Sequence, residues 1–418
     1  MAAGFLVTIV GLLGVLTPTL RSAVDPRFWP VGVLLIVLGG VVLVLGIRGL
    51  IRSVLSAFLP HTPTEVTELY VRSRSLTRGP RVVVLGGGTG MPILLRGLKP
   101  YTANLTAIVT SSDDGGSSGR LRSALGVPPP GDVRNCILAL AETEPLLEKL
   151  FQYRFEGGIG LEGHAFGNLF LAAMERITGD FQEAIIQSSR VLAVRGRVLT
   201  ATREPVILGA QFEDGRWVFG ESLIPKVGQA VKTVRLEPEG VEARGEVIEA
   251  IREAEVVVLA PGSLWTSILP VLIVPGVADA IRASRAVKVY VQNLMTQPGE
   301  TEGLAAADHV RSIEAHAPGV VDWVVLNREP IAPSVLERYQ RQGANQVSAD
   351  RGVLEALGKR VVTADLLAAG EFVRHDADRL ARSVLGIAVK DIGAFEARRR
   401  FDLYLLAERL RHDEGGGS

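Results

Sequence analysis

Hydrophobic and polar positions divide the chain into an apolar head and a body of alternating strands and helices. Two stretches, residues 2–20 and 28–47, contain no charged side chain and are apolar all round, unlike an amphipathic surface helix. Their 19 and 20 residues are each long enough to cross a bilayer as a helix. A short polar segment joins them. The pattern predicts a transmembrane helical hairpin over residues 1–47.

A cleaved signal peptide is a weaker interpretation of the head, because no Lys or Arg precedes the first stretch and a second apolar stretch follows it. More arginines follow the hairpin than lie in its loop, which contains Arg21 and Arg27. The positive-inside rule then places both termini in the cytoplasm. We therefore expect a two-span, multi-pass protein of the cell membrane with a cytoplasmic main domain. Residues 48–80 are a juxtamembrane linker.

The body, residues 81–413, repeats apolar runs that end in polar turns and are followed by helical spacing. Runs rich in β-branched residues, typical of buried parallel strands, cover residues 81–85, 105–110, 256–259, 287–291, 322–326 and 360–363. Residues 198–244 show short alternating runs instead, with Asp214-Gly215 as a hairpin turn. The predicted fold class is α/β: a Rossmann-like, mostly parallel sheet with a small antiparallel β insertion. Residues 414–418 form a flexible tail.

Composition narrows the classes of partner. The 418 residues include 45 Lys+Arg and 45 Asp+Glu, so the net charge is zero. Neutrality argues against a general nucleic-acid binder, which usually carries a basic excess. The single cysteine, Cys136, excludes an internal disulfide and a cysteine zinc cluster. We expect a small-molecule ligand and no nucleic acid.

A glycine-rich turn, Gly86-Gly87-Gly88-Thr89-Gly90, follows the first strand of the body and precedes a helix. Backbone N–H groups in such a turn bind phosphate, so residues 87–90 are candidate ligand-binding residues: Gly87, Gly88, Thr89 and Gly90. Tight packing is the alternative reason for the glycines. Met91 stands where the dinucleotide fingerprint has its third glycine, which argues against an NAD-type dehydrogenase.

Further polar residues follow other strands, at the sheet edge where open α/β folds bind ligands. Asp113 and Asp114 are candidates for a ribose contact or for magnesium, which prefers carboxylate oxygens. Asp132 is either an N-cap or a ligand contact, and Arg134 either pairs with it or binds phosphate. His164, at a helix start, is either structural or touches an anion or a sugar. The remaining candidates are Ser117, Ser118, Arg120, Asn135, Asn168, Ser263, Asn293 and Thr296.

Several motifs of the body resemble the gluconeogenesis-factor family, which is YvcK/CofD-like. The resemblance runs from about residue 80 to about residue 390, and the apolar head lies outside it. The motifs are the glycine-rich turn, Asp113-Asp114-Gly115-Gly116-Ser117-Ser118-Gly119-Arg120, Pro129-Pro130-Gly131-Asp132-Val133-Arg134-Asn135, Gly163-His164-Ala165-Phe166-Gly167-Asn168, Pro261-Gly262-Ser263-Leu264-Trp265-Thr266 and Asn293-Leu294-Met295-Thr296-Gln297-Pro298-Gly299-Glu300-Thr301.

The resemblance implies a Rossmann-like sheet and a regulatory protein that binds a UDP-sugar of the UDP-N-acetylglucosamine type. It also implies a role in cell morphogenesis and envelope synthesis, including peptidoglycan, during gluconeogenic growth. The alternative is a magnesium-dependent transferase that acts on a nucleotide-diphosphate-linked donor, similar to 2-phospho-L-lactate transferase. Binding itself would require no cofactor. We expect a diphosphate over the glycine-rich turn beside Arg120 and Arg134, a homodimer, and envelope-synthesis or regulatory proteins as partners.

Overall fold

The computed structural model describes residues 34, 37–46, 48, 76–142, 145–391, 406 and 410. The chain forms two compact units, Met1–Ser75 and Leu76–Ser418. In the first unit, Val37–Gly46 is a short apolar helix. Most of the predicted hairpin lies outside the described residues.

The described residues contain no single helix that is long and apolar enough to cross a membrane. In the second unit, Leu264–Leu272 and Val277–Ala283 together reach that length and composition, but they are bent by 72°. Most of their apolar side chains are buried in the core of the second unit. Core helices commonly have this composition, so the pair is explained by its place in the fold.

The second unit is built on a seven-stranded sheet in the order β10-β9-β8-β7-β1-β2-β3, in which every neighbouring pair is parallel. The prediction of a mostly parallel α/β sheet is confirmed. The strands are β1 Val82–Gly86, β2 Leu105–Val109, β3 Arg197–Thr200, β7 Val256–Leu259, β8 Val287–Val291, β9 Trp323–Asn327 and β10 Arg360–Ala364.

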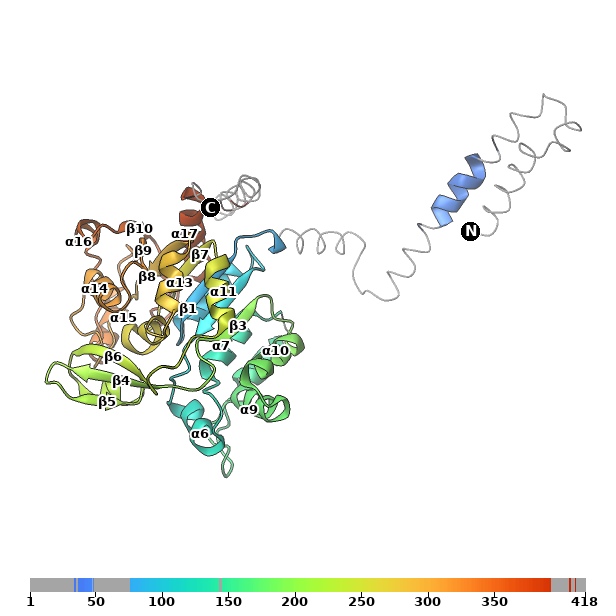
Figure 1. Ribbon diagram of the computed structural model, residues 1–418. Coiled ribbons are helices and arrows are strands. Elements are labelled where there is room, and N and C mark those ends of the chain that lie inside the picture. Colours follow the sequence, from blue (N-terminus) through green and yellow to red (C-terminus); the bar gives the residue numbers. More distant parts are fainter. Residues whose placement is uncertain are drawn as a thin grey trace, which may run out of the picture. The chain divides into compact units, whose positions relative to one another are not determined.

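A separate antiparallel sheet has the order β5-β4-β6 (Figure 1). Its strands are β4 Ile207–Phe212, β5 Trp217–Phe219 and β6 Val231–Glu237. The predicted turn at Asp214-Gly215 joins β4 to β5, and the Asp214 carboxylate accepts a hydrogen bond from the Arg216 amide at 3.0 Å. The antiparallel sheet begins only after β3, because β3 pairs with β2 in the main sheet.

Alternate side chains of β1 enter two different cores, one on each face of the sheet. Val82 and Val84 join the core that contains α5 (Gly90–Leu98), α7 (Gly131–Leu140) and α17 (Ala377–Lys390). Val83 and Leu85 join the core that contains α11 (Gly245–Glu253), α13 (Val277–Ala283) and α14 (Ala306–His316). The other helices are α6 Gly116–Leu125, α8 Pro145–Gln152, α9 Phe166–Thr178, α10 Phe181–Val191, α12 Leu269–Leu272, α15 Pro333–Gln340, α16 Arg351–Ala356, and the short η2 Ile224–Val227 and η3 Leu264–Ile268.

The start of α7 corrects one expectation. Asp132 is not the N-cap, because the helix already begins at Gly131 and Pro130 occupies the cap position without a side-chain cap hydrogen bond. The fixed φ of proline starts the helix there. The Asp132 side chain is therefore available for the glycine-rich turn, and its carboxyl group accepts a hydrogen bond from the backbone of Gly88.

Candidate functional site

A cleft of about 600 Å³ opens beyond the carboxyl ends of β1, β7 and β8. The sheet order reverses between β1 and β7, since β2 and β3 lie on one side and β8 to β10 on the other. Such a switch point is where open α/β sheets bind ligands. Six predicted residues line this cleft: Gly88, Thr89, Gly90, Ser263, Asn293 and Thr296.

The glycine-rich turn forms one wall of the cleft. Gly88 has a φ of +67°, a conformation that side chains rarely adopt. A Cβ on Gly90 would collide with the carbonyl oxygen of Pro261, so the first wall and the loop after β7 are in close contact. Helix α5 starts directly after the turn, without a side-chain cap and without an acidic residue in its first turn. Its N-terminal amides can therefore receive an anion.

On the opposite wall of the cleft, the polar side chains mainly form hydrogen bonds that fix the loops of that wall. Asn293 accepts from the Gly262 amide at 2.8 Å and donates to the Gly262 carbonyl at 2.6 Å. The Thr296 hydroxyl accepts from the amide of Asn345 at 2.9 Å. The Ser263 hydroxyl donates to the Glu300 carboxylate. These predicted residues shape the cleft through the loops they fix.

Two cleft residues that the sequence analysis missed, Arg374 and His375, come from the segment before α17. Arg374 is exposed and is the only Arg or Lys among the described residues of the cleft lining. Burial lowers the pKa of His375 to about 4, although a hydrogen bond to the Gln292 backbone acts in the other direction. Nε2 of His375 has no partner among the described residues. The cleft thus offers one guanidinium and one neutral imidazole.

An acidic cluster, Asp113, Asp114, Asp132 and Glu221, lies beside the glycine-rich turn. Burial raises the pKa of Asp132 to about 6, and the negative charge of Asp113 adds to this. Burial also raises the pKa of Glu221, followed by the charges of Asp113, Asp132 and Asp114. Glu221 lines the cleft but belongs to the segment after β5. The sequence analysis missed it because it treated that segment as separate from the site.

Both predicted magnesium ligands, Asp113 and Asp114, already accept hydrogen bonds from backbone amides. One oxygen of Asp113 accepts from the Gly115 amide at 2.9 Å, and one oxygen of Asp114 accepts from the Ser222 amide at 2.8 Å. In the described ranges, no three His, Cys, Asp or Glu side chains are grouped to hold a metal ion. Magnesium often uses one or two carboxylates together with substrate phosphates. Asp113 and Asp114 fit that donor set only when a phosphate ligand completes it.

The remaining predicted residues form a second group that does not line the cleft. The Ser117 hydroxyl is 3.0 Å from Nδ1 of His164 and accepts from the Asn168 amide group at 3.0 Å. Arg134 donates from Nη1 to Asn168 and from Nη2 to Asn135, both at 2.9 Å. Nearby, Ser118 accepts from the Gly131 amide at 3.1 Å. Arg120 lies beside Gly163, to whose carbonyl Arg154, another missed residue, donates at 2.5 Å.

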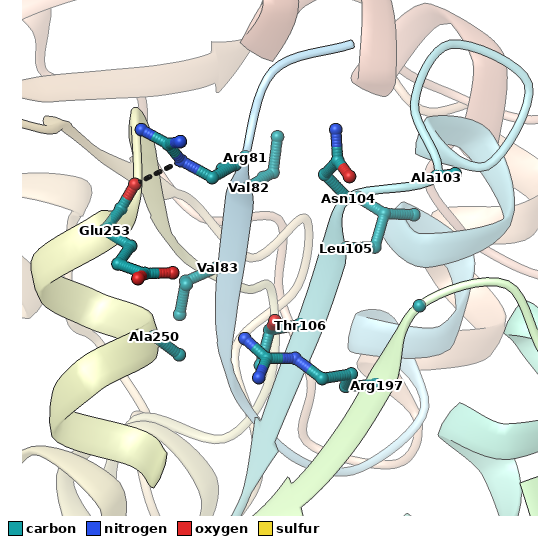
Figure 2. Close-up of a pocket in the computed structure, with 11 residues that line it drawn as sticks. Arg81, Val82, Val83, Ala103, Asn104, Leu105, Thr106, Arg197, Ala250 and Glu253 are labelled. Atoms are coloured by element: carbon teal, nitrogen blue, oxygen red, sulfur yellow. Dashed lines mark hydrogen bonds between the residues drawn. The ribbon is translucent and has the colours of Figure 1, made fainter. Parts of the chain in front are cut away.

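A second pocket, of about 440 Å³, lies at the amino ends of β1, β2 and β3 (Figure 2). Arg81, Asn104, Thr106, Arg197 and Glu253 contribute to its lining, and Nε of Arg81 donates to the Glu253 carbonyl at 2.6 Å. This is the edge of the sheet opposite the switch point. The cleft at the carboxyl edge is therefore the candidate functional site.

Comparisons with known proteins agree with this architecture. The family model described as 2-phospho-L-lactate transferase CofD matches residues 82–367. A putative gluconeogenesis factor from Nostoc sp. is 48% identical over 356 residues, covering 84% of this chain and 78% of that protein. The gluconeogenesis factor of Bacillus subtilis is 48% identical over 304 residues, covering 72% of this chain and 96% of that protein.

A solved structure shares the fold as well as the sequence. The crystal structure of a UPF0052 family protein from Bacillus halodurans superposes with a TM-score of 0.71 at 50% sequence identity. The match covers 73% of this chain and 99% of that one. A family model that matches most of the body, and close relatives matched over most of their own length, show that the chain belongs to the gluconeogenesis factor family, which carries a CofD domain.

Proposed function

We propose that the protein is a regulatory protein that binds a nucleotide sugar of the UDP-N-acetylglucosamine type in the cleft. The observation that carries the proposal is the position of the cleft at the switch point of the sheet, between the glycine-rich turn and the loops after β7 and β8. Resemblance to gluconeogenesis factors supports a role in cell morphogenesis and envelope synthesis during gluconeogenic growth.

In this proposal the diphosphate lies at the N-terminus of α5, where free amides and the helix dipole favour negative charge. Arg374 supplies the positive charge, because guanidinium geometry matches phosphate oxygens. Nε2 of His375 accepts a hydrogen bond from a hydroxyl or amide N–H of the ligand. A neutral imidazole with an unpartnered nitrogen suits such a donor.

Calorimetric titration with UDP-N-acetylglucosamine tests the proposal. Loss of a hydrogen bond to a charged group costs about 1.5–3 kcal/mol, so Arg374→Ala should weaken binding by about 10- to 150-fold. Arg252→Ala, at an exposed arginine of α11, is the matched control and should bind like the wild type. The melting temperatures of all three proteins should agree. Absence of binding by the wild type, or equal affinity of Arg374→Ala, would contradict the proposal.

A second candidate function, a magnesium-dependent transferase, is favoured by the acidic cluster beside the cleft. Asp113 and Asp114 would hold magnesium together with ligand phosphates, and the ion would neutralise charge on the nucleotide diphosphate. Phosphorus NMR separates the two candidates after incubation of UDP-N-acetylglucosamine with magnesium and the protein. Unchanged diphosphate signals are expected of a regulatory protein. Breakage of the diphosphate, with UMP released and the sugar phosphate passed to water as the available acceptor, would favour the transferase.

A further inference from the structure

Three arginines that do not line the cleft converge near the acidic cluster. Nη1 of Arg154 donates to the Gly163 carbonyl at 2.5 Å, and a Cβ on Gly163 would lie 2.9 Å from Nη2 of Arg120. Arg134 lies close enough for Arg154 to lower its pKa, second only to the effect of burial. We call Arg120, Arg134 and Arg154 the basic cluster.

The positive charge of the basic cluster is not matched by ion pairs. Across the described ranges, none of the three guanidinium groups forms a salt bridge with a carboxylate. Arg134 is held by two neutral amide side chains, and its buried Nε has no partner in the part of the chain that the structure describes. Burying an arginine beside another arginine is unfavourable unless a negative charge joins them.

Helix termini add to this positive potential. The first turns of α6, α7 and α9 meet here: Ser117 of α6 bonds Asn168 of α9, and Ser118 accepts from the first residue of α7. Neither α6 nor α9 has an acidic residue in its first turn, whereas α7 has Asp132 there. Positive ends of three helix dipoles therefore point toward the same region.

His164 lies where the positive charges of the basic cluster affect its pKa. It is buried, and Nδ1 lies 3.0 Å from the Ser117 hydroxyl. Its pKa is lowered by burial and then by the charges of Arg120 and Arg154. Asp113 and Asp132 act on the neighbouring Arg134 and are not among the charges that shift the pKa of His164. A bound anion would offset the arginine charges and raise the pKa of His164.

We propose that the basic cluster is a second ligand site, which binds a small anion of two or more negative charges while the cleft holds the nucleotide sugar. A phosphate ester and a polycarboxylate share the required chemistry. One observation separates this site from the cleft: none of the three arginines lines the cleft. The inference rests on the proposed function only for the occupant of the cleft.

Calorimetric titration of the full-length protein with inorganic pyrophosphate, in saturating UDP-N-acetylglucosamine, tests the second site. Citrate in a parallel titration distinguishes a polycarboxylate from a phosphate. We expect binding of at least one probe, and about 10- to 100-fold weaker binding by Arg154→Ala, since one charged hydrogen bond is lost. UDP-N-acetylglucosamine affinity should not change. Arg252→Ala is again the matched control. The His164 pKa, followed by proton NMR, should rise when the probe binds.

The possible failures are distinguishable. Pyrophosphate and citrate that both fail to bind, or that bind equally to wild type and Arg154→Ala, would overturn the second site. Competition of the probe with UDP-N-acetylglucosamine, with Arg154→Ala weakening both alike, would also overturn it, because the basic cluster would then belong to the cleft. If UDP-N-acetylglucosamine does not bind but pyrophosphate binding depends on Arg154, the proposed function fails and the second site stands.

Discussion

Asp132 is a carboxylic acid held in an unfavourable place for its charge. Burial raises its pKa from 3.8 to about 6, Asp113 adds repulsion, and the hydrogen bond from Gly88 offsets only part of this. Between pH 4 and 6 the folded protein therefore binds more protons at this position than the unfolded chain does. Stability from this group is highest below pH 4 and falls as the pH rises through 6.

Replacing Asp132 by its neutral isostere Asn should reveal this dependence of stability on pH. Asp132→Asn keeps an acceptor for the Gly88 amide and removes the charge, so it should gain stability relative to the wild type as the pH rises. The pKa shift corresponds to a difference on the order of 1–3 kcal/mol between pH 4 and pH 7. Urea unfolding of residues 76–418 across this range measures the difference. A difference that is the same at every pH would contradict the assignment.

Taking the difference in stability between the wild type and Asp132→Asn at each pH also removes the contribution of two histidines, which opposes that of Asp132. Burial lowers the pKa values of His309 and His375 to about 4. Each keeps its proton in the unfolded chain up to about pH 6.5, so their contributions to stability rise with pH in the window where that of Asp132 falls. Both histidines are present in the wild type and in Asp132→Asn. Their contributions cancel in the difference, although they flatten the pH dependence of either protein alone.

At the scale of elements, the packing of α5 on α17 depends on one small residue. A Cβ on Gly97 of α5 would collide with the Ala377 carbonyl oxygen and lie 3.0 Å from the Cβ of Ala381. The two helices can approach this closely only because Gly97 has no side chain. Since α5 starts at the glycine-rich turn and α17 follows Arg374 and His375, this contact helps to fix both walls of the cleft.

Gly97→Ala should therefore destabilise the body, by about 1–3 kcal/mol, because it overpacks a helix–helix contact. The matched control is Gly386→Ala in α17, where a new Cβ would meet nothing within 4 Å. Helix propensity predicts that this control gains about 0.5–1 kcal/mol. Thermal and urea unfolding of residues 76–418 measure both variants. Equal effects of the two substitutions would show that the approach of α5 and α17 does not limit stability.

The strands were predictable because parallel strands buried on both faces are continuous apolar runs. The runs at 256–259 and 287–291 coincide with β7 and β8, while β3 was hidden in the predicted insertion because it is a short edge strand. The polar residues that follow the strands were predictable for the same reason. The grouping of polar residues in the cleft could not be predicted from the sequence. Glu221 and His375 reach the cleft only through tertiary contacts, which no local pattern encodes.

At the scale of the whole molecule, the apolar head and the body are separate units in the chain. Relatives from Halalkalibacterium halodurans and Bacillus subtilis match over 95% and 96% of their own lengths but cover only 73% and 72% of this chain. Proteins of about the length of the body therefore exist by themselves. The apolar head remains a predicted membrane anchor with the body on the cytoplasmic side.

Fractionation of expressing cells tests the anchor. Full-length protein should sediment with membranes and require detergent for extraction, because residues 2–20 and 28–47 are uncharged. Residues 76–418 should stay in the soluble fraction. Residues 49–418, which keep the linker and lose only the apolar stretches, are the matched control and should also be soluble. Recovery of full-length protein in the soluble fraction without detergent would contradict the predicted membrane anchor.

The order of strands in the sheet also determines when β1 can pair with its neighbour during synthesis. Val82 of β1 pairs with Val256 of β7, 174 residues later in the chain. A ribosome adds about 5–20 residues per second, so β1 waits roughly 10–35 s for this neighbour. During that interval the glycine-rich turn has no opposite wall, and one edge of the central strand is open to other chains. Because Arg374 and His375 are made later still, a ligand of the cleft can stabilise only a nearly finished chain and cannot protect that edge earlier in synthesis.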